Sequence, residues 1–348
     1  MHPGDFQFDN FLSDMAVGQS DSKGYFEEGS DSLAGIPFKE PGYEGKIDYR
    51  IRQLSYSSLL SLHSCPRKFQ LYKLRTTHRS EEALESTITF AFGHIVGEGI
   101  QLIFAGHSIE TVIFEMFKGW HTDLFARDDK GKKSFWEAVI ALQRFVAIKE
   151  SGFLNDYDLL YYSGKPACEL SFAINFPDGF RLRGFVDAVL VHRTTGEIIV
   201  VECKTTGSKS LNPATYKNSA QAIGYSVVLD VIAPDVSSYE VLYLVYQTHS
   251  GEYQPFRFPK TYLQRALWIQ EILLDIELIK LYENTGVYPM HGESCYNFFR
   301  ECEYFNTCTM STEYLTKKCT PEEEDKTEYQ INLSLQDLLN AQLSKVTG

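Results

Sequence analysis

The sequence predicts an α/β fold in which a mixed central β-sheet is flanked by helices. Apolar runs of strand length, separated by turn residues, recur between residues 157 and 258. Segments with apolar residues at helical spacing precede this block over residues 54–153 and follow it over residues 261–286. Strands bracketed by such segments are typical of helices packed on a sheet. We therefore expect a sheet core with an N-terminal helical elaboration.

The composition is that of a globular protein. Of its 348 residues, 43% are hydrophobic and 14% are aromatic, which is enough for a buried core. The sequence has no run of about eighteen apolar residues, the length that a membrane span needs. Its first ten residues, MHPGDFQFDN, lack the basic and apolar parts of a secretion signal. We therefore expect a cytoplasmic protein, in a bacterium or in the host of a phage.

The charge is acidic overall but uneven. A net charge of -13 argues against a protein that coats nucleic acid by bulk attraction. The stretch HSCPRKFQLYKLRTTHR nevertheless holds five Arg or Lys residues and no acid. Such a local basic patch is what a groove that follows a DNA backbone needs, although an ordinary solvated face has the same composition. The candidate DNA-binding residues are Arg67, Lys68, Lys73 and Arg75.

The first elements are an acidic arm and two helices. Residues 1–50 are rich in Gly, Ser and Asp and carry ten acids against four bases, which predicts a disordered arm that is a candidate partner-binding segment. From Leu54 apolar residues recur at turn spacing, with Ser55 or Ser57 as the N-cap. Pro66 lies inside this run and predicts a break into two helices.

Further helices and the strands follow in order. Residues 83–105 read as a helix in which Gly93 and Gly97 allow another element to approach closely. Two more helical runs come next, followed by two strands and then the two strands of the central hairpin. After the hairpin come a helix, two more strands and a long closing helix that ends at Gly286. These predicted elements cover residues 108–129, 133–151, 157–162, 168–176, 181–191, 198–204, 214–230, 239–248, 253–258 and 261–286.

The central hairpin carries three ionisable groups. Its strands, RLRGFVDAVLV and IIVVECK, are joined by a turn at residues 194–196. Glu202 and Lys204 are two residues apart, so they share one strand face, and Asp187 lies on the partner strand. Burying two acids and a lysine is costly unless they are compensated, and a divalent metal on two carboxylates would compensate them. A structural acid–lysine pair is the alternative.

Several of these segments resemble the PD-(D/E)XK nuclease superfamily, in the branch of RecB-like and AddB-like nucleases and the exonucleases of CRISPR adaptation. The resemblance covers roughly residues 54–310 and is carried by GFVDAVLV, VVECKTT and QAIGY. It implies a restriction-endonuclease-like core. It also implies that Asp187 and Glu202 bind Mg²⁺ or Mn²⁺ with the main-chain carbonyl of Cys203, that Lys204 is the catalytic lysine, and that Gln221 and Tyr225 form the Q-x-x-x-Y helix.

One position departs from this family. Many members carry G-x-x-x-H on an early helix, and counting from Gly93 the histidine position is Gly97. Glu98 or His94 is the candidate replacement as a metal-site group; of the two we favour Glu98, and a plain surface glutamate is the alternative. Glu169 opens a strand near the hairpin, and the simplest interpretation is an acid at the rim of the site.

A cysteine cluster lies near the end. Cys295, Cys302 and Cys308 are close in sequence, and in a reducing compartment such thiols usually bind metal. The resemblance implies that Cys65 of CPRKF joins them around a [4Fe–4S] cluster, forming a clasp between the two ends of the domain. Cys319 is a rival fourth ligand, and zinc is the alternative metal. Cys168 and Cys203 are predicted to be core residues.

The function predicted is a metal-dependent DNA exonuclease of recombination, repair or phage DNA metabolism. A catalytically lapsed DNA-binding module and a restriction-type endonuclease are the alternatives. The predicted domains are the arm at 1–50, the nuclease domain at 51–312 and an acidic tail at 313–348, which carries a short amphipathic helix over 334–343. DNA is the expected partner, and the arm or the last helix is a candidate site for a recombination or replication protein.

Overall fold

The computed structural model describes residues 50–74, 83–120, 133–230, 233, 239–297, 300–309 and 325–347. Most of the predicted N-terminal arm, residues 1–49, therefore lies outside the described residues. Among the described residues, no helix combines the length and the apolar character needed to cross a membrane.

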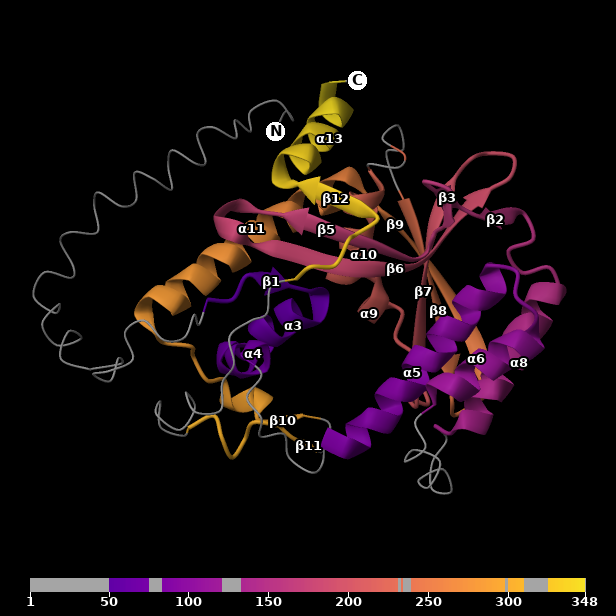
Figure 1. Ribbon diagram of the computed structural model, residues 1–348, viewed down its shortest axis with the longest axis horizontal. Helices are drawn as coiled ribbons and strands as arrows, with labels where there is room; N and C mark the ends of the chain where they lie inside the picture. The colour runs from indigo at the N-terminus through magenta and orange to yellow at the C-terminus, as the bar shows by residue number, and fades with distance from the viewer. Residues whose placement is uncertain are drawn as a thin grey trace, which may run out of the picture.

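An eight-stranded mixed sheet forms the centre of the molecule (Figure 1). Its main path runs β12–β5–β6–β7–β8–β9, and β1 and β2 also pair with β6. The pairs β12–β5, β7–β8 and β1–β6 are parallel, and the others are antiparallel. The predicted mixed sheet flanked by helices is confirmed. The strands are β1 (Gln53–Leu54), β2 (Tyr157–Leu159), β5 (Cys168–Asn175), β6 (Arg181–His192), β7 (Ile198–Thr206), β8 (Tyr239–Gln247), β9 (Glu252–Lys260) and β12 (Ile331–Ser334).

The predicted central hairpin is present as β6 and β7. The turn between them includes Gly196 at φ +71°, a left-handed conformation that glycine adopts without steric cost. The strand β6 has twelve residues and is long enough to pair with four strands: β1 and β5 along its first part, and β2 and β7 along the part next to the turn. This length places the middle of β6 at the junction of two halves of the sheet.

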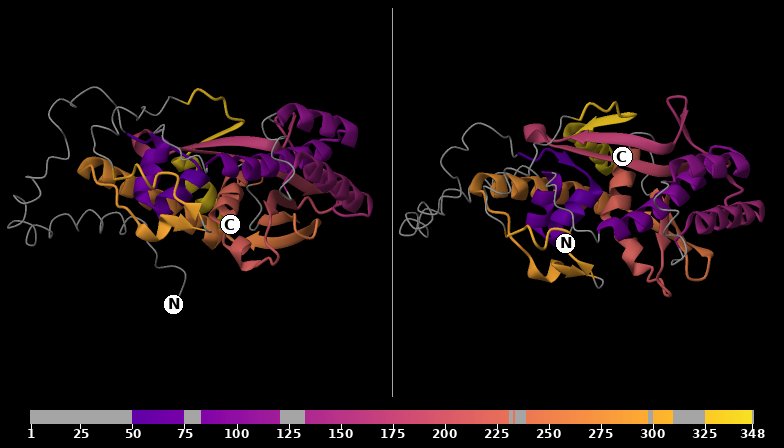
Figure 2. Two further views of the ribbon diagram at one scale, coloured as in Figure 1. Left: turned by 90° about the horizontal axis from the view of Figure 1, so that it is seen from below. Right: turned by 60° about the horizontal axis from the view of Figure 1, so that its bottom comes forward.

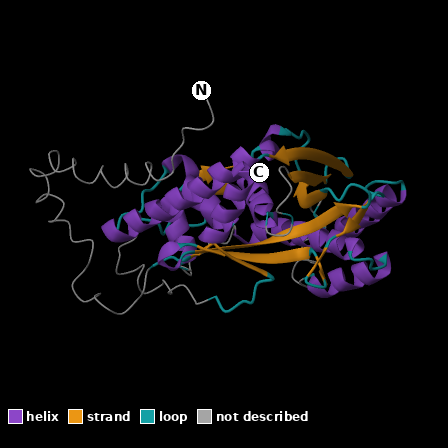
Figure 3. Ribbon diagram, turned by 90° about the horizontal axis from the view of Figure 1, so that it is seen from above, coloured by secondary structure: helices purple, strands orange, loops and turns teal. Residues whose placement is uncertain are grey.

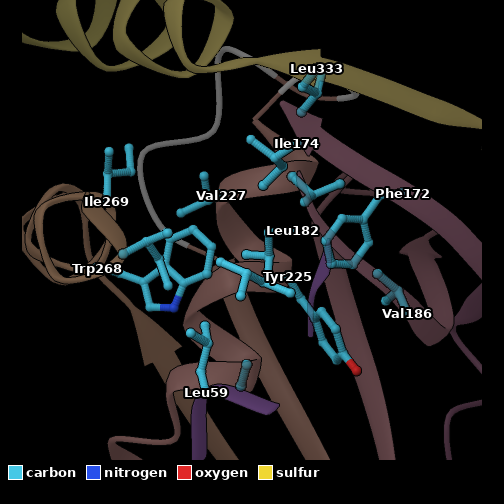
Figure 4. Close-up of a cluster of buried hydrophobic side chains, with 14 of the residues drawn as sticks. Leu59, Phe172, Ile174, Leu182, Val186, Tyr225, Val227, Trp268, Ile269 and Leu333 are labelled. Atoms are coloured by element: carbon cyan, nitrogen blue, oxygen red, sulfur yellow. The ribbon is translucent and has the colours of Figure 1, made fainter. Parts of the chain in front are cut away.

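Two apolar cores lie on opposite sides of the sheet (Figure 3). The first core packs α3 (Tyr56–Ser64), α4 (Pro66–Lys73), α10 (Ala220–Leu229), α11 (Tyr262–Thr285) and α13 (Leu335–Thr347). The second packs α5 (Ala83–Phe104), α6 (Ile109–Gly119) and α8 (Phe135–Glu150). Figure 4 shows part of the first core, where Trp268 of α11 and Tyr225 of α10 lie among aliphatic side chains from the sheet.

The helix boundaries follow the predicted signals. Ser55 caps α3 with a capping box, and Pro66 begins α4 after a one-residue break. The closing helix α11 ends at Gly286, which has φ +69°. The helix predicted over 214–230 is divided into α9 (Ala214–Lys217) and α10, and the second half of the run predicted over 108–129 lies outside the described residues.

The C-terminal segment belongs to the sheet, which the sequence did not predict. Residues 331–334 form β12, which pairs in parallel with β5 and covers the edge of the sheet (Figure 2). Leu338 of α13 is 1% exposed and is part of the first core. The amphipathic helix predicted near residue 334 therefore docks on its own domain, so the boundary expected at residue 312 does not separate it from the fold.

Small paired segments complete the described chain. The hairpin β3 (Tyr161–Tyr162) and β4 (Lys165–Pro166) leads into β5, and β10 (Tyr296–Asn297) pairs with β11 (Arg300–Glu301) in the cysteine-rich segment. In Figure 1 this segment lies beside α4. The main-chain amide of Arg67 donates to the carbonyl of Pro289 at 3.0 Å, which joins the two ends of the fold there.

Candidate active site

Two acids face each other where β6 and β7 separate. Ala188 is paired with Val201, so the next positions along the ladder place Asp187 opposite Glu202. At this point the two strands stop pairing, because β6 continues along β5 while β7 continues along β8. The amide of Cys203 instead donates to Asp187 Oδ2 at 2.9 Å. We call this opening, formed by Asp187, Glu202 and Lys204, the fork.

Lys204 and the helix α10 complete the fork. Lys204 Nζ forms an ion pair with Glu202 Oε1 and donates to Gln221 Oε1 at 3.2 Å. Gln221 Nε2 then donates to the Tyr225 hydroxyl at 2.6 Å. Gln221 and Tyr225 are one helical turn apart, which is why one face of α10 presents both to the sheet. The structure thus brings together the five residues that the sequence analysis proposed for catalysis.

Burial and mutual charge govern the ionisation of the fork. Burial and then the charge of Glu202 raise the pKa of Asp187 well above its ordinary value, although the Cys203 amide opposes this. Burial also raises the pKa of Glu202, against the effect of Lys204. Burial lowers the pKa of Lys204, but the charge and hydrogen bond of Glu202 outweigh it and the net shift is upward. A positive charge added at the fork would therefore stabilise the ionised form of both acids.

The fork fits a hard divalent cation. Glu202 is 1% exposed, and its Oε2 atom has no hydrogen-bond partner among the residues that the structure describes. A buried carboxylate oxygen without a partner is costly and is a preferred ligand of Mg²⁺ or Mn²⁺. No group of three or more His, Cys, Asp or Glu side chains in the described ranges is placed to hold a metal ion. An ion here would use two carboxylates and complete its shell with a main-chain oxygen and water.

Glu169 is a third acid beside the fork, where the sequence indicated an acid at the rim of the site. Cys168 pairs with Ala188 and Leu170 with Val186, so Glu169 stands opposite Asp187 across the β5–β6 ladder. Its φ of +48° is left-handed, which is uncommon outside glycine and is often found at functional sites. The charge of Glu169 adds to the rise in the pKa of both Asp187 and Glu202.

A buried glutamine fixes Glu169 in this position. Gln101 of α5 is 5% exposed, and its Nε2 atom donates to Glu169 Oε1 at 2.7 Å. The family's histidine position, Gly97, lies one turn earlier on the same helix. In the sequence, Glu169 could be recognised as an acid at the start of a strand. Its position opposite Asp187 depends on strand register, which the sequence does not show.

The two candidates for the missing histidine lie elsewhere. Glu98 and His94 are both exposed, and Glu98 Oε2 lies 4.0 Å from His94 Nε2. Neither side chain lines the cavity at the fork. Their exposed positions on α5 do not support a role in metal binding, whereas Glu169 acts on both acids of the fork through its charge.

A cavity of about 460 Å³ opens from the fork between α3, α10 and α11. Asp187, Glu169, Gln221 and Tyr225 lie at one part of its wall, and His63 and Asp275 at another. His63 Nε2 lies 2.8 Å from Asp275 Oδ1, and this hydrogen bond raises the pKa of His63. The cavity has the size of a site for a small ligand or a segment of chain, and Asp187 connects it to the fork.

The four cysteines proposed as ligands lie in one region. Cys65 is buried at the start of α4, and the charges of Cys295, Cys302 and Cys65 all act on Cys308, although burial is the main reason that its pKa is raised. Cys302 donates its amide to the Cys295 carbonyl at 2.8 Å. The thiols are neighbours but do not form a metal-binding group in the described structure. Cys319 lies outside the described residues, whereas Cys168 and Cys203 pack against the second core as predicted.

Side chains of the basic stretch contact the cysteine-rich segment near the other end of the nuclease domain. Arg67 Nε donates to the Cys308 carbonyl at 3.1 Å, and Lys68 lies 3.9 Å from Glu303. Both side chains are thus engaged in the cysteine-rich segment, which weakens their case as DNA-binding residues. Lys73 also has contacts within the chain, and Arg75 lies outside the described residues.

Comparisons with known proteins agree with this geometry. A family model described as the PD-(D/E)XK nuclease superfamily matches residues 53–309, which is more than half of the chain. No curated protein matches the chain. Among solved structures, the crystal structure of SSO0001 is similar, with 13% identity, coverage of 80% of this chain and 90% of that chain, and a TM-score of 0.30. At that TM-score the likeness supports no conclusion about function.

Proposed function

Because the chain belongs to the PD-(D/E)XK nuclease superfamily, we propose that it is a metal-dependent exonuclease that hydrolyses the phosphodiester bonds of linear DNA. The observation that carries this proposal is the fork. Asp187 and Glu202 lie opposite each other in the strand register, and one buried oxygen of Glu202 has no hydrogen-bond partner among the described residues. Lys204 forms an ion pair with Glu202 and is held by Gln221 of α10. Recombination, repair or phage DNA metabolism is the setting we propose, from the family resemblance.

Each residue of the fork has a distinct proposed role. Asp187 and Glu202, with the Cys203 carbonyl, would hold Mg²⁺ or Mn²⁺, and Glu169 would add a third carboxylate beside them. The ion would polarise the phosphate and lower the pKa of a bound water. Lys204 orients the attacking water and stabilises negative charge that develops on the phosphate. Gln221 holds the ammonium of Lys204 in place, and Tyr225 holds Gln221.

The two alternatives have less support. A lapsed nuclease would have no need to keep two acids and a lysine together at a cost in burial, since apolar residues there would be more stable. A restriction-type endonuclease acts within long duplexes, whereas the cavity at the fork lies between helices and the sheet and has the volume of a small ligand site. Access to a free strand end is easier to reconcile with this shape.

Incubation of the purified protein with linear and circular DNA and Mg²⁺ or Mn²⁺ separates the three functions. An exonuclease degrades the linear substrate and spares the circle, and Lys204→Ala loses that activity by at least a hundredfold. Discrete cuts in circular DNA would indicate the endonuclease. Binding without hydrolysis by the wild-type protein would indicate the lapsed module, and equal activity of Lys204→Ala would contradict the role of the lysine.

We also propose a [4Fe–4S] cluster on Cys65, Cys295, Cys302 and Cys308. The support is that these four cysteines, from the two ends of the nuclease domain, lie in one region, together with the thiolate preference of iron–sulfur clusters. Thiolates also bind zinc, which makes the metal content decisive. Anaerobically purified protein should contain iron and sulfide and be brown, and Cys302→Ala should lose both. A colourless preparation loaded with zinc would refute the cluster.

A further inference from the structure

Two exposed phenylalanines border the cavity at the fork. Phe90 of α5 is 79% exposed and Phe185 of β6 is 47% exposed, and both line this cavity. Within the described residues, neither ring packs against another aromatic ring. Large apolar side chains gathered at the mouth of a cavity often mark a binding surface.

The position of Phe185 ties it to the fork. It lies two residues before Asp187 on β6, and residues two apart on a strand share one face. The neighbouring residue Gly184 has no side chain, and a Cβ there would lie 2.7 Å from the ring of Phe172. The ring of Phe172 therefore fills the core beneath this part of β6 while Phe185 remains at the surface of the cavity.

The position of Phe90 depends on the approach of α5 to β7. A Cβ on Gly93 would lie 3.2 Å from Thr205 Oγ1, so this helix passes close to the strand just beyond Lys204. Phe90 is three residues, almost one turn, before Gly93. The two phenylalanines thus reach the cavity from different elements, and each of these elements also contacts the fork.

Charge alone would not hold a nucleic acid strand in this cavity. Its lining contains the acids Glu169, Glu271 and Asp275 as well as Asp187. The two cationic groups on that lining are occupied, because Arg183 lies 3.1 Å from Asp325 and His63 is bonded to Asp275. Phosphate binding depends on cations that acids have not already neutralised, so much of the affinity for a strand must come from contacts with its bases.

We propose that Phe185 and Phe90 hold an unpaired base of the substrate strand by stacking beside the fork. This inference rests on the proposed nuclease function and names its substrate class, which is a single-stranded or frayed end. A volume of about 460 Å³ is on the scale of a drug-sized ligand and hence of about one or two nucleotides. A base paired within a duplex has both faces covered by its neighbours, whereas an unpaired base offers a face to an aromatic ring.

Binding to three fluorescent probes in Ca²⁺ tests the stacking. The probes are a single-stranded thymidine oligonucleotide, the same strand with abasic sites at its terminal nucleotides, and a blunt duplex. The wild-type protein should bind the intact strand roughly ten- to a hundredfold more tightly than the abasic strand, the range expected for stacked bases. Phe185→Ala should lose most of this ratio and Phe90→Ala part of it.

Matched variants make the result specific. Phe185→Tyr keeps an aromatic ring and should keep the ratio. Phe114→Ala removes an aromatic side chain of similar exposure, 60%, that lies on α6 and outside the cavity lining, and it should behave as the wild type. An unchanged ratio in both alanine variants of the cavity would overturn the proposal.

Cleavage of the same probes in Mg²⁺ separates this inference from the proposed function. A wild-type protein that degrades the intact and abasic strands at equal rates would be a nuclease that does not use base stacking, and the inference alone would fail. A protein that neither binds nor degrades any probe would contradict both.

Discussion

The unusual chemical feature at the scale of the residue is a row of acids across three strands. Glu169, Asp187 and Glu202 stand opposite one another, and like charges in opposed positions destabilise a sheet. Within the part of the chain that the structure describes, one lysine, Lys204, forms an ion pair with an acid of this row, Glu202. These acids lie at the point where β6 and β7 stop pairing, which is where a cation and a phosphate would find room.

Replacement of Glu169 by Gln tests the third acid. The amide removes the charge opposite Asp187 but can still accept the hydrogen bond from Gln101. We expect nuclease activity to fall about ten- to a hundredfold, as for groups that support a metal site, and the Mg²⁺ concentration needed for half activity to rise. Folding stability should be unchanged or higher, because repulsion is relieved.

Glu98→Gln is the matched control for that variant, because Glu98 is an exposed acid on α5 that lies outside the cavity lining. It should retain wild-type activity and Mg²⁺ dependence. The reverse result, with Glu98→Gln impaired and Glu169→Gln active, would restore the original assignment of Glu98.

A buried lysine makes a prediction about pH. Lys260 is fully buried at the end of β9, donates to the Lys217 carbonyl, and has its pKa lowered by burial to about 8 from 10.5. Between these values the unfolded chain binds more protons than the folded one, so this group makes stability rise with pH across that window. Lys260→Met should flatten that rise in denaturant unfolding curves measured from pH 8 to 10.5. An identical pH slope in both proteins would contradict it.

How far the sequence predicts the site depends on whether the residues share one element. Glu202 with Lys204 and Gln221 with Tyr225 lie two and four residues apart, so strand and helix periodicity were sufficient to place each pair on one face. Glu169 and Asp187 meet only through the register between β5 and β6. No local pattern encodes that register, so the sequence alone indicates only that Glu169 is an acid at the rim of the site.

At the scale of the element, the close approach of α10 and α11 positions the lysine. A Cβ on Gly224 would lie 2.7 Å from Trp268 Cζ2, so only glycine allows the two helices to pack at this distance. Gly224 lies between Gln221 and Tyr225, the pair that connects Lys204 to the core. The packing of α10 against α11 therefore sets how far Gln221 extends over the fork.

Gly224→Ala should destabilise the fold although alanine favours helices. The helical gain is about 1 kcal/mol, whereas overpacking against a rigid indole costs about 1–3 kcal/mol, so a net loss of up to about 2 kcal/mol is expected in chemical denaturation. Gly97→Ala on α5 is the control, since a Cβ there meets nothing within 4 Å, and it should be neutral or gain up to about 1 kcal/mol. Equal effects of the two substitutions would contradict this account of the helix packing.

Element boundaries were predictable where a cap or breaker marks them. Ser55, Pro66 and Gly286 each act through local backbone chemistry, and the structure places helix ends at all three. The strand β12 has only four residues and no such signal. Its place at the sheet edge depends on pairing with β5, a segment far away in the sequence, so the sequence analysis recovered the adjoining helix but not the strand.

At the scale of the whole molecule, the two ends of the fold secure each other. β12 covers the edge of β5, which would otherwise be open to pairing with another chain. Asp325, which shortly precedes β12 in the sequence, forms an ion pair with Arg183 on the wall of the cavity. The cysteine-rich segment is joined to α4 through Arg67 and to the end of α3 through Ser294, whose hydroxyl donates to the Ser64 carbonyl at 2.6 Å. The site is thus held between segments from both ends of the chain.

A leucine in the last helix tests whether the C-terminal segment is part of the core. Leu338→Ala should lower the free energy of unfolding by about 2–5 kcal/mol, because Leu338 is 1% exposed in the first core. Leu267→Ala on α11 removes the same atoms from a side chain that is 59% exposed and should change stability by less than about 0.5 kcal/mol. A small effect at Leu338 would mean that the segment is a detachable tail.

The central claim is that Asp187 and Glu202 together hold a divalent cation at the fork. Calorimetric titration of Mn²⁺ into the folded protein measures this directly, with Asp187→Asn, Glu202→Gln and the exposed control Glu98→Gln. The account predicts that the wild-type protein and the control bind the ion and that each fork variant loses at least tenfold in affinity. Mn²⁺ binding of wild-type strength by both fork variants would contradict it.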